Sequence, residues 1–193
     1  MGTAESRGTI VTTVVGDVIA PDVGEIEMST SLSDVIDAVG SGLAPGRTVK
    51  AVFSGVANAV ITTADLDVPL TYEGFQAIGS GIGSAGFIVD DDTACMVDAA
   101  YRFSRFLSIE SCGQCPPCKL GSSAITEHLE RIQTGTGTDH DLGEIARWVG
   151  TRHWKHGSTF SIDTGAPRCL PATEPTPTYD VDNGQVFVST GDD

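Results

Sequence analysis

The sequence predicts an α+β fold in which a small sheet domain precedes a helical bundle. Short β-branched stretches, separated by turn residues, fill residues 9–90, with one amphipathic helix among them. Apolar residues then recur at helical spacing in three segments of residues 91–171. Residues 172–193 are rich in proline and threonine, which predicts a tail, and residues 1–8 are expected to form a short N-terminal tail.

The first domain is expected to form its sheet from five short strands. "TIVTTVVGDV" and "APDVGEIEM" predict two strands joined by a turn, and "TVKAVFSG", "AVITT" and "GFIVD" predict three more. Between them, "STSLSDVIDAVG" carries apolar residues at helical spacing, a cap candidate at Ser31 or Ser33, and a stop at Gly40. We therefore expect one helix packed on a small sheet.

The second domain is expected to consist of short helices that share one core. The first helix follows the cap candidates Asp91, Asp92 and Thr93, the second begins near Ser122, and the third covers about Asp141 to Val149. The residues expected to face inward are Met96, Ala100, Phe103 and Leu107, then Ile125, Leu129 and Ile132, then Leu142, Ile145 and Trp148. In the tail, "YDVDNGQVFV" predicts a hairpin around Asn183-Gly184.

Composition limits the possible partners and compartments. The formal net charge is −15, which argues against a nucleic-acid partner because phosphates would be repelled. The N-terminus "MGTAESRGTI" does not resemble a secretory signal, and no apolar stretch is long enough to span a membrane. We therefore expect a cytoplasmic protein, in which clustered thiols stay reduced and are available to bind metal.

A glycine-rich stretch, "GSGIGSAG", contains a G-x-G-x-x-G match at residues 81–86. In dinucleotide-binding folds such a match follows a strand and opens a helix, because the pyrophosphate lies at the helix N-terminus. Here the glycines precede the strand "FIVD", so the order is inverted. We interpret the stretch as a turn that packs close to a neighbour; the alternative is that its amides face a cofactor held by a partner domain.

Three of the five cysteines lie in "ESCGQCPPCKLG", at Cys112, Cys115 and Cys118. This C-x₂-C-x₂-C spacing is typical of iron–sulfur clusters, which thiolates hold. The fourth ligand must be remote, and Cys95 and Cys169 are the candidates. Cys95 is expected inside the first turns of an apolar helix, whereas Cys169 lies in a proline-flanked loop, "APRCLP", which favours Cys169.

Other interpretations of these cysteines remain open. Zinc is possible, because His153 and His156 lie between Cys118 and Cys169, although zinc sites more often show paired C-x₂-C units. "CPPC" could be a redox dithiol, but it lacks the strand-to-helix context of that motif. The run 90–92 is interpreted as helix capping and not as a calcium site, and His128 and His140 carry no motif.

The cysteine stretch resembles the cluster loop of the NADH-binding flavoprotein subunit of bacterial respiratory complex I. The related subunits of NAD-linked hydrogenases and formate dehydrogenases share this loop, which typically reads E-S-C-G-x-C-x-P-C-R-x-G. Glu110, Ser111, Gly113, Pro117 and Gly121 match it along with the cysteines, and Lys119 replaces the arginine. "VVGDVIAPDVGEIEMSTSLSDVIDAVG" is similar to the family's soluble-ligand-binding β-grasp domain. The resemblance covers about Thr9 to Pro171.

The resemblance implies a ubiquitin-like β-grasp domain followed by a helical domain that holds a [4Fe-4S] cluster on Cys112, Cys115, Cys118 and Cys169. It implies single-electron transfer within an NADH oxidoreductase complex that includes a flavoprotein and a further iron–sulfur protein. The family's flavin-binding loop, G-R-G-G-A-G-F-P, does not occur in this sequence. We therefore expect FMN and NAD only through a missing or partner domain, and no catalysis by this chain alone. The rival hypothesis is a binding or assembly module with a structural zinc.

Overall fold

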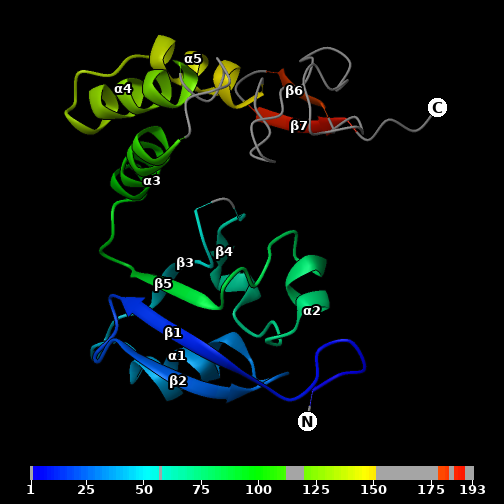
Figure 1. Cartoon of the computed structure of the whole chain (residues 1–193). Helices are drawn as coiled ribbons and strands as arrows, with labels where there is room; N and C mark the ends of the chain where they lie inside the picture. The colour runs from blue at the N-terminus through cyan, green and yellow to red at the C-terminus, as the bar shows by residue number, and fades with distance from the viewer. Residues whose placement is uncertain (1, 57, 112–119, 151–177, 183–184, 190–193) are drawn as a thin grey trace. The chain divides into compact units, whose positions relative to one another are not determined.

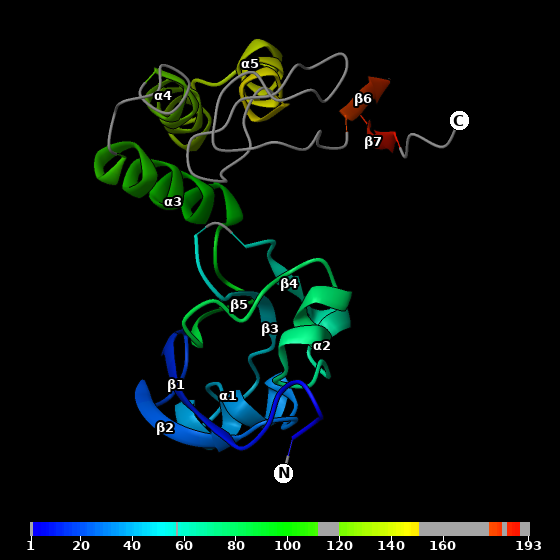
Figure 2. The same cartoon turned by 45° about the vertical axis from the view of Figure 1, so that its right-hand side comes forward.

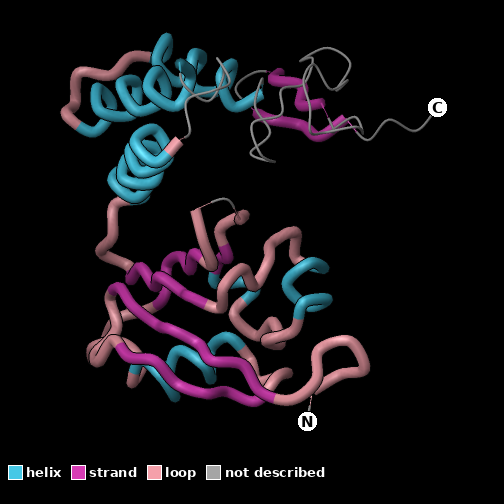
Figure 3. The backbone as a smooth tube through the Cα atoms, viewed as in Figure 1, coloured by secondary structure: helices cyan, strands magenta, loops and turns pink. Residues whose placement is uncertain are grey.

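The computed structural model describes residues 2–56, 58–111, 120–150, 178–182 and 185–189. The chain divides into two compact units, residues 1–94 and 95–193, which are described separately below. Figure 3 shows that the first unit contains the main sheet, whereas helices dominate the described part of the second. None of the helices in these described ranges is long and apolar enough to cross a membrane.

Unit 1 is built on a mixed five-stranded sheet with the strand order β2-β1-β5-β3-β4 (Figure 1). Its strands are β1 (Thr9–Gly16), β2 (Asp22–Glu27), β3 (Val49–Phe53), β4 (Ile61–Thr62) and β5 (Gly86–Asp91). The central strands β1 and β5 run parallel, and all other neighbours are antiparallel. The strands expected from the sequence are therefore present.

The helix α1 (Leu32–Gly40) begins and ends as its sequence predicts. The Ser31 side chain accepts a hydrogen bond from the amide of Asp34, which makes Ser31 the N-cap. The apolar face of α1 packs against β1 and β2, where its side chains are buried. At Gly24 of β2 an added Cβ would lie 3.0 Å from Val39 of α1, so this glycine permits the close approach of helix and sheet.

A second helix in unit 1, α2 (Tyr72–Ala77), contradicts the prediction of a single helix. Its N-cap, Thr71, accepts a hydrogen bond from the amide of Gly74, and Phe75 packs on Phe87 of β5 with ring centroids 5.8 Å apart. Gly74 lowers the local helix propensity, so a contact distant in sequence supports this short helix. A 3₁₀ turn, η1 (Thr63–Asp65), precedes it.

The acidic run at the end of β5 does not cap a helix, which is a second correction. Asp91 accepts hydrogen bonds from the amide and hydroxyl of Thr93, and Asp92 accepts one from the amide of Thr48. Arg47 lies 3.5 Å from a carboxylate oxygen of each of these aspartates. The Thr93 bonds and the nearby cations hold the pKa of Asp91 below its ordinary value. These carboxylates therefore fasten the end of β5 to the segment before β3.

Unit 2 contains the helices α3 (Met96–Glu110), α4 (Ser122–Gln133) and α5 (Asp139–Gly150). Helix α4 packs against both α3 and α5, as Figure 2 shows. The two expected strands of the tail are present as the antiparallel pair β6 (Thr178–Asp182) and β7 (Gln185–Ser189), and the predicted turn residues 183–184 lie outside the described residues.

The described helices of unit 2 bury one apolar side chain fully and others in part. Among residues 95–111 and 120–149, Ile125 is the apolar side chain that is fully buried, at 7 % exposure, and most of the other residues expected to face inward are half-buried. Two residues expected to face inward are exposed: Ala100, and Leu142 at 57 %. Polar groups take part in the interior instead, because Ser122 and Asp141 are buried. Helical spacing identified these helices correctly but overstated their apolar core.

Candidate metal centre

The cysteine stretch connects two packed helices. Helix α3 ends at Glu110, and its C-cap, Ser111, has an extended backbone with φ −62° and ψ 136°. Helix α4 begins at Ser122, and most of the loop that the sequence predicts between the two helices lies outside the described residues. Cys112, Cys115 and Cys118 lie outside the described residues, as do Cys169, His153 and His156. The structure therefore describes the two helices that flank the cysteine stretch, and not the cysteines within it.

Cys95 is the one cysteine among the described residues, and it lies at the start of α3, whereas the cysteine stretch follows the end of this helix. It is the N-cap of α3, exposed and one residue before the helix, so the prediction that it lies inside the helix is wrong. Helix α3 has 15 residues. At about 1.5 Å per residue it separates its two ends by roughly 22 Å. Cys112 follows the end of α3 by two residues in the sequence, so the length of this helix argues against Cys95 as the fourth ligand.

The glycine-rich stretch is a tight turn before β5. It leads into β5 instead of opening a helix, as the residue order predicts. The carbonyl of Gly81 accepts hydrogen bonds from the Ser54 hydroxyl at 2.5 Å and from the Asn58 side-chain amide at 3.1 Å. Gly83 has φ +59°, and a Cβ there would lie 2.8 Å from the Ser54 carbonyl. The glycines therefore permit close packing against Ser54 and Asn58.

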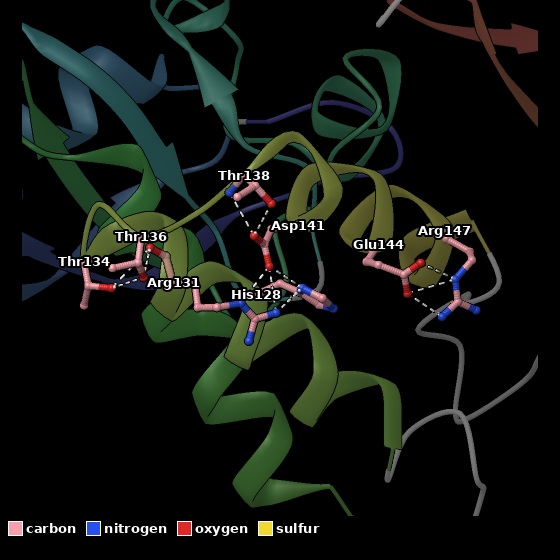
Figure 4. Close-up of polar contacts among 8 residues, drawn as sticks. All are labelled: His128, Arg131, Thr134, Thr136, Thr138, Asp141, Glu144 and Arg147. Atoms are coloured by element: carbon pink, nitrogen blue, oxygen red, sulfur yellow. Dashed lines mark hydrogen bonds and ion pairs between the residues drawn. The ribbon is translucent and has the colours of Figure 1, made fainter.

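Sequence reasoning missed a polar cluster between α4 and α5, which we call the Asp141 cluster (Figure 4). The carboxylate of Asp141 is 2.8 Å from Nδ1 of His128 and accepts a hydrogen bond from Nε of Arg131 at 2.7 Å. Its other oxygen accepts bonds from the amide and the hydroxyl of Thr138. His128 first, then Thr138 and Arg131, hold the pKa of Asp141 well below its ordinary value.

The Asp141 cluster fastens the turn between α4 and α5 and is not a metal site. Within the ranges that the structure describes, no three His, Cys, Asp or Glu side chains are placed to hold a metal. Thr138 precedes α5 directly and Asp141 is the third residue of that helix, a spacing typical of a capping box. That spacing is the one sequence feature from which part of the cluster could have been predicted. The contact between His128 and Asp141 depends on how α4 packs on α5.

Comparison with known proteins identifies the region around the cysteine stretch. Residues 98–159 match the NADH-ubiquinone oxidoreductase-F iron-sulfur binding region. This range contains Cys112, Cys115 and Cys118 and ends before Cys169.

Individual relatives extend the similarity beyond that region. NADP-reducing hydrogenase subunit HndC of Solidesulfovibrio fructosivorans is 39% identical over 146 residues, which are 75% of this chain and 30% of HndC. The second F subunit of the NADH-quinone oxidoreductases of Rhizobium meliloti (strain 1021) is 38% identical over 146 residues, 75% of this chain and 35% of its own length. The chain thus spans about a third of these relatives.

A solved structure also resembles this chain over part of its own length. An NAD+-reducing [NiFe]-hydrogenase in the H2-reduced state matches with a TM-score of 0.68 and 30% identity, over 81% of this chain and 26% of the hydrogenase chain. The resemblance inferred from the cysteine stretch is therefore confirmed. Residues 98–159 thus match the NADH-ubiquinone oxidoreductase-F iron-sulfur binding region, and the chain as a whole is similar to one part of the F subunits and of HndC.

Proposed function

We propose that this chain is an electron-transfer module that holds a [4Fe-4S] cluster. The observation that carries the proposal is the C-x₂-C-x₂-C stretch inside residues 98–159, the region that matches an iron–sulfur binding family. Thiolates are the ligands such clusters use, so the donor set fits the group. When bound, the cluster would accept and release one electron at a time; the chain's part is to hold it and to tune its potential.

Cys112, Cys115, Cys118 and Cys169 are the proposed ligands. The length of α3 supports Cys169, because it places Cys95 roughly 22 Å from the start of the cysteine stretch. Cys169 lies 51 residues after Cys118 in the sequence. That separation is no obstacle, since the entropic cost of closing a loop grows only with the logarithm of its length.

The proposed source of electrons lies outside this sequence. The relatives are named as subunits of hydrogenases and quinone oxidoreductases that react with NADP or NADH, and the chain spans about a third of them. We propose that FMN and NAD act through a missing or partner domain and that a further iron–sulfur protein of the same complex accepts the electrons. A cytoplasmic location, at most peripheral to a membrane through the complex, agrees with this proposal.

The proposed architecture is a ubiquitin-like β-grasp domain over residues 9–90 and an iron–sulfur helical bundle over residues 91–171, with tails at 1–8 and 172–193. Support for the β-grasp assignment comes from the strand order, the parallel central pair and the packing of α1 on β1 and β2. Support for the bundle comes from the packing of α3 on α4 and of α4 on α5. The domain boundaries stay a prediction.

Metal analysis of the anaerobically purified chain tests the function. We expect brown protein with broad absorption at roughly 400 nm and about four irons per chain. Colourless protein with one zinc per chain would instead support the rival, a binding or assembly module with a structural metal. Cys169→Ser and Cys112→Ser are expected to lose iron, whereas the matched control Cys95→Ser keeps it. Loss of iron in Cys95→Ser with retention in Cys169→Ser would overturn the ligand assignment.

A further inference from the structure

The interface between α3 and α4 is polar where it approaches the cysteine stretch. The hydroxyl oxygens of Ser108 and Ser123 are 3.1 Å apart, and those of Ser104 and Thr126 are 2.8 Å apart. The Thr126 hydroxyl donates to the carbonyl of Ser122 at 2.7 Å. Because that bond uses the single hydroxyl proton of Thr126, Ser104 is the donor in the Ser104–Thr126 pair. The hydroxyls of α3 are thereby linked to the first turn of α4.

These pairs follow one antiparallel register over the whole interface. Moving from Ser104 to Ser108 along α3 corresponds to moving back from Thr126 to Ser123 along α4. At the far end of both helices, the Gln133 side chain donates to the carboxylate of Asp98, in the same register. Ser108–Ser123 is thus the pair nearest the stretch among these contacts: Ser108 precedes Cys112 by four residues, and Ser123 follows Cys118 by five.

Hydroxyl pairs suit this position because they fix the helices relative to each other. Small side chains allow two helices to approach closely, and a hydrogen bond is directional, so sliding one helix along the other breaks it. These hydrogen bonds add a directional constraint to the apolar packing, in which Ile125 is the fully buried apolar side chain among residues 95–111 and 120–149. The separation of the two ends of the cysteine stretch therefore depends on these hydroxyls.

We propose that Ser108 and Ser123, supported by Ser104 and Thr126, are positioning residues for the cluster. They fix the end of α3 relative to the start of α4, and these two helix ends flank the proposed ligands Cys112, Cys115 and Cys118 in the sequence. The inference rests on the proposed function, since it assumes that these thiolates bind iron. None of the four hydroxyls is assigned as a ligand; they act through the two helix ends that carry the stretch.

The test compares iron-loaded wild-type chain with the double variant Ser108→Ala, Ser123→Ala. Alanine has a higher helix propensity than serine, so both helices should persist, which circular dichroism checks. We expect the variant to release iron to a chelator about fivefold faster, the effect of losing one ordinary hydrogen bond. We also expect altered g-values in the electron paramagnetic resonance spectrum of the reduced cluster, which a general loss of stability would not cause.

Gln133→Ala is the matched control, because it removes a side-chain bond from the far end of the same interface. It should lower thermal stability while leaving the iron-release rate and the g-values as in the wild type. Wild-type behaviour of the serine variant, or equally fast release in Gln133→Ala, would overturn the inference and leave the proposed function intact. If the double variant does not fold, the single variant Ser123→Ala tests the inference by the same two measurements. Wild-type chain without iron would overturn the proposed function, and this inference with it.

Discussion

Replacing Thr12 with valine should stabilise unit 1, because the threonine hydroxyl is buried without a partner. Thr12 lies in β1 and is 0 % exposed, and its Oγ1 has no hydrogen-bond partner among the described residues. Its ladder partner in β2 is Gly24, where α1 approaches the sheet closely. On folding, the hydroxyl therefore gives up the water that it binds in the unfolded chain and gains no bond in exchange.

The expected gain follows from that lost hydration. An unsatisfied buried hydroxyl costs about 1–3 kcal/mol. Valine has the same branched shape and a similar strand preference, so Thr12→Val should raise the free energy of unfolding by about 1–2 kcal/mol. For a unit of this size that shift corresponds to an increase of at least about 4 °C in melting temperature. Thr12→Ser keeps the hydroxyl and removes the methyl group, so it should lower stability by about 1 kcal/mol.

Hydrogen exchange measured by mass spectrometry on the full chain can assign the change to unit 1. Amides of β1 and β5, which pair in parallel, should exchange more slowly in Thr12→Val and faster in Thr12→Ser, whereas α4 and α5 should be unchanged. Faster exchange of β1 in Thr12→Val would refute the reasoning, because it would mean that the hydroxyl makes a bond whose loss is costly.

Four further outcomes are expected. The pKa of Asp141 lies below its ordinary value of 3.8. Its carboxylate therefore stabilises the α4–α5 turn above pH 3.8, and this stabilisation is lost as the pH falls below that value. In an acid titration followed by circular dichroism, Asp141→Asn should reduce the loss of helical signal over this pH range. Glu73 accepts hydrogen bonds from the hydroxyls of Thr3 and Ser6 and so holds the N-terminal segment against α2. Because Glu73→Ala removes these bonds, trypsin should cleave faster after the exposed Arg7. An unchanged cleavage rate would argue against this role of Glu73. Lys119→Glu should lower the midpoint potential of the cluster, because a negative charge beside a ligand disfavours reduction; a higher or unchanged potential in a redox titration contradicts this. Removing iron should increase hydrogen exchange in α3 and α4 without affecting β1 and β5.

The sequence predicted those elements whose evidence is local. Strand alternation and turn residues identify the strands of unit 1, and Ser31 with its following apolar spacing identifies α1. Helix α2 was missed because its support is tertiary: Phe75 packs on Phe87 across the sequence, while Gly74 weakens the local helical signal. The capping role expected for Asp91 failed for a similar reason, since Thr93 and Arg47 occupy its carboxylate.

In the candidate site, too, the sequence predicts the features that depend on local spacing and misses those that depend on tertiary packing. Their spacing predicts Cys112, Cys115 and Cys118 as ligands, because C-x₂-C-x₂-C is typical of iron–sulfur clusters. The sequence also favours Cys169 over Cys95, and the length of α3 argues in the same direction, whereas Cys169 itself lies outside the described residues. The contact between His128 and Asp141 could not be predicted, because 13 residues separate them and only the packing of α4 on α5 brings them together.

The two units are stabilised in different ways, and this difference would give the proposed cluster a structural role. Unit 1 has a continuous apolar core that includes Phe75 and Phe87, so it needs no further support to hold its sheet. The described helices of unit 2 bury Ile125 and otherwise depend on hydroxyl pairs and on the Asp141 cluster. Neutral hydrogen bonds contribute only about 1 kcal/mol each, so these contacts specify register better than they supply stability. In the proposed function, metal–thiolate bonds would join Cys118, which precedes α4, to Cys169, 51 residues further along the chain, and would add stability to unit 2 because the free energy of ligand binding becomes folding free energy.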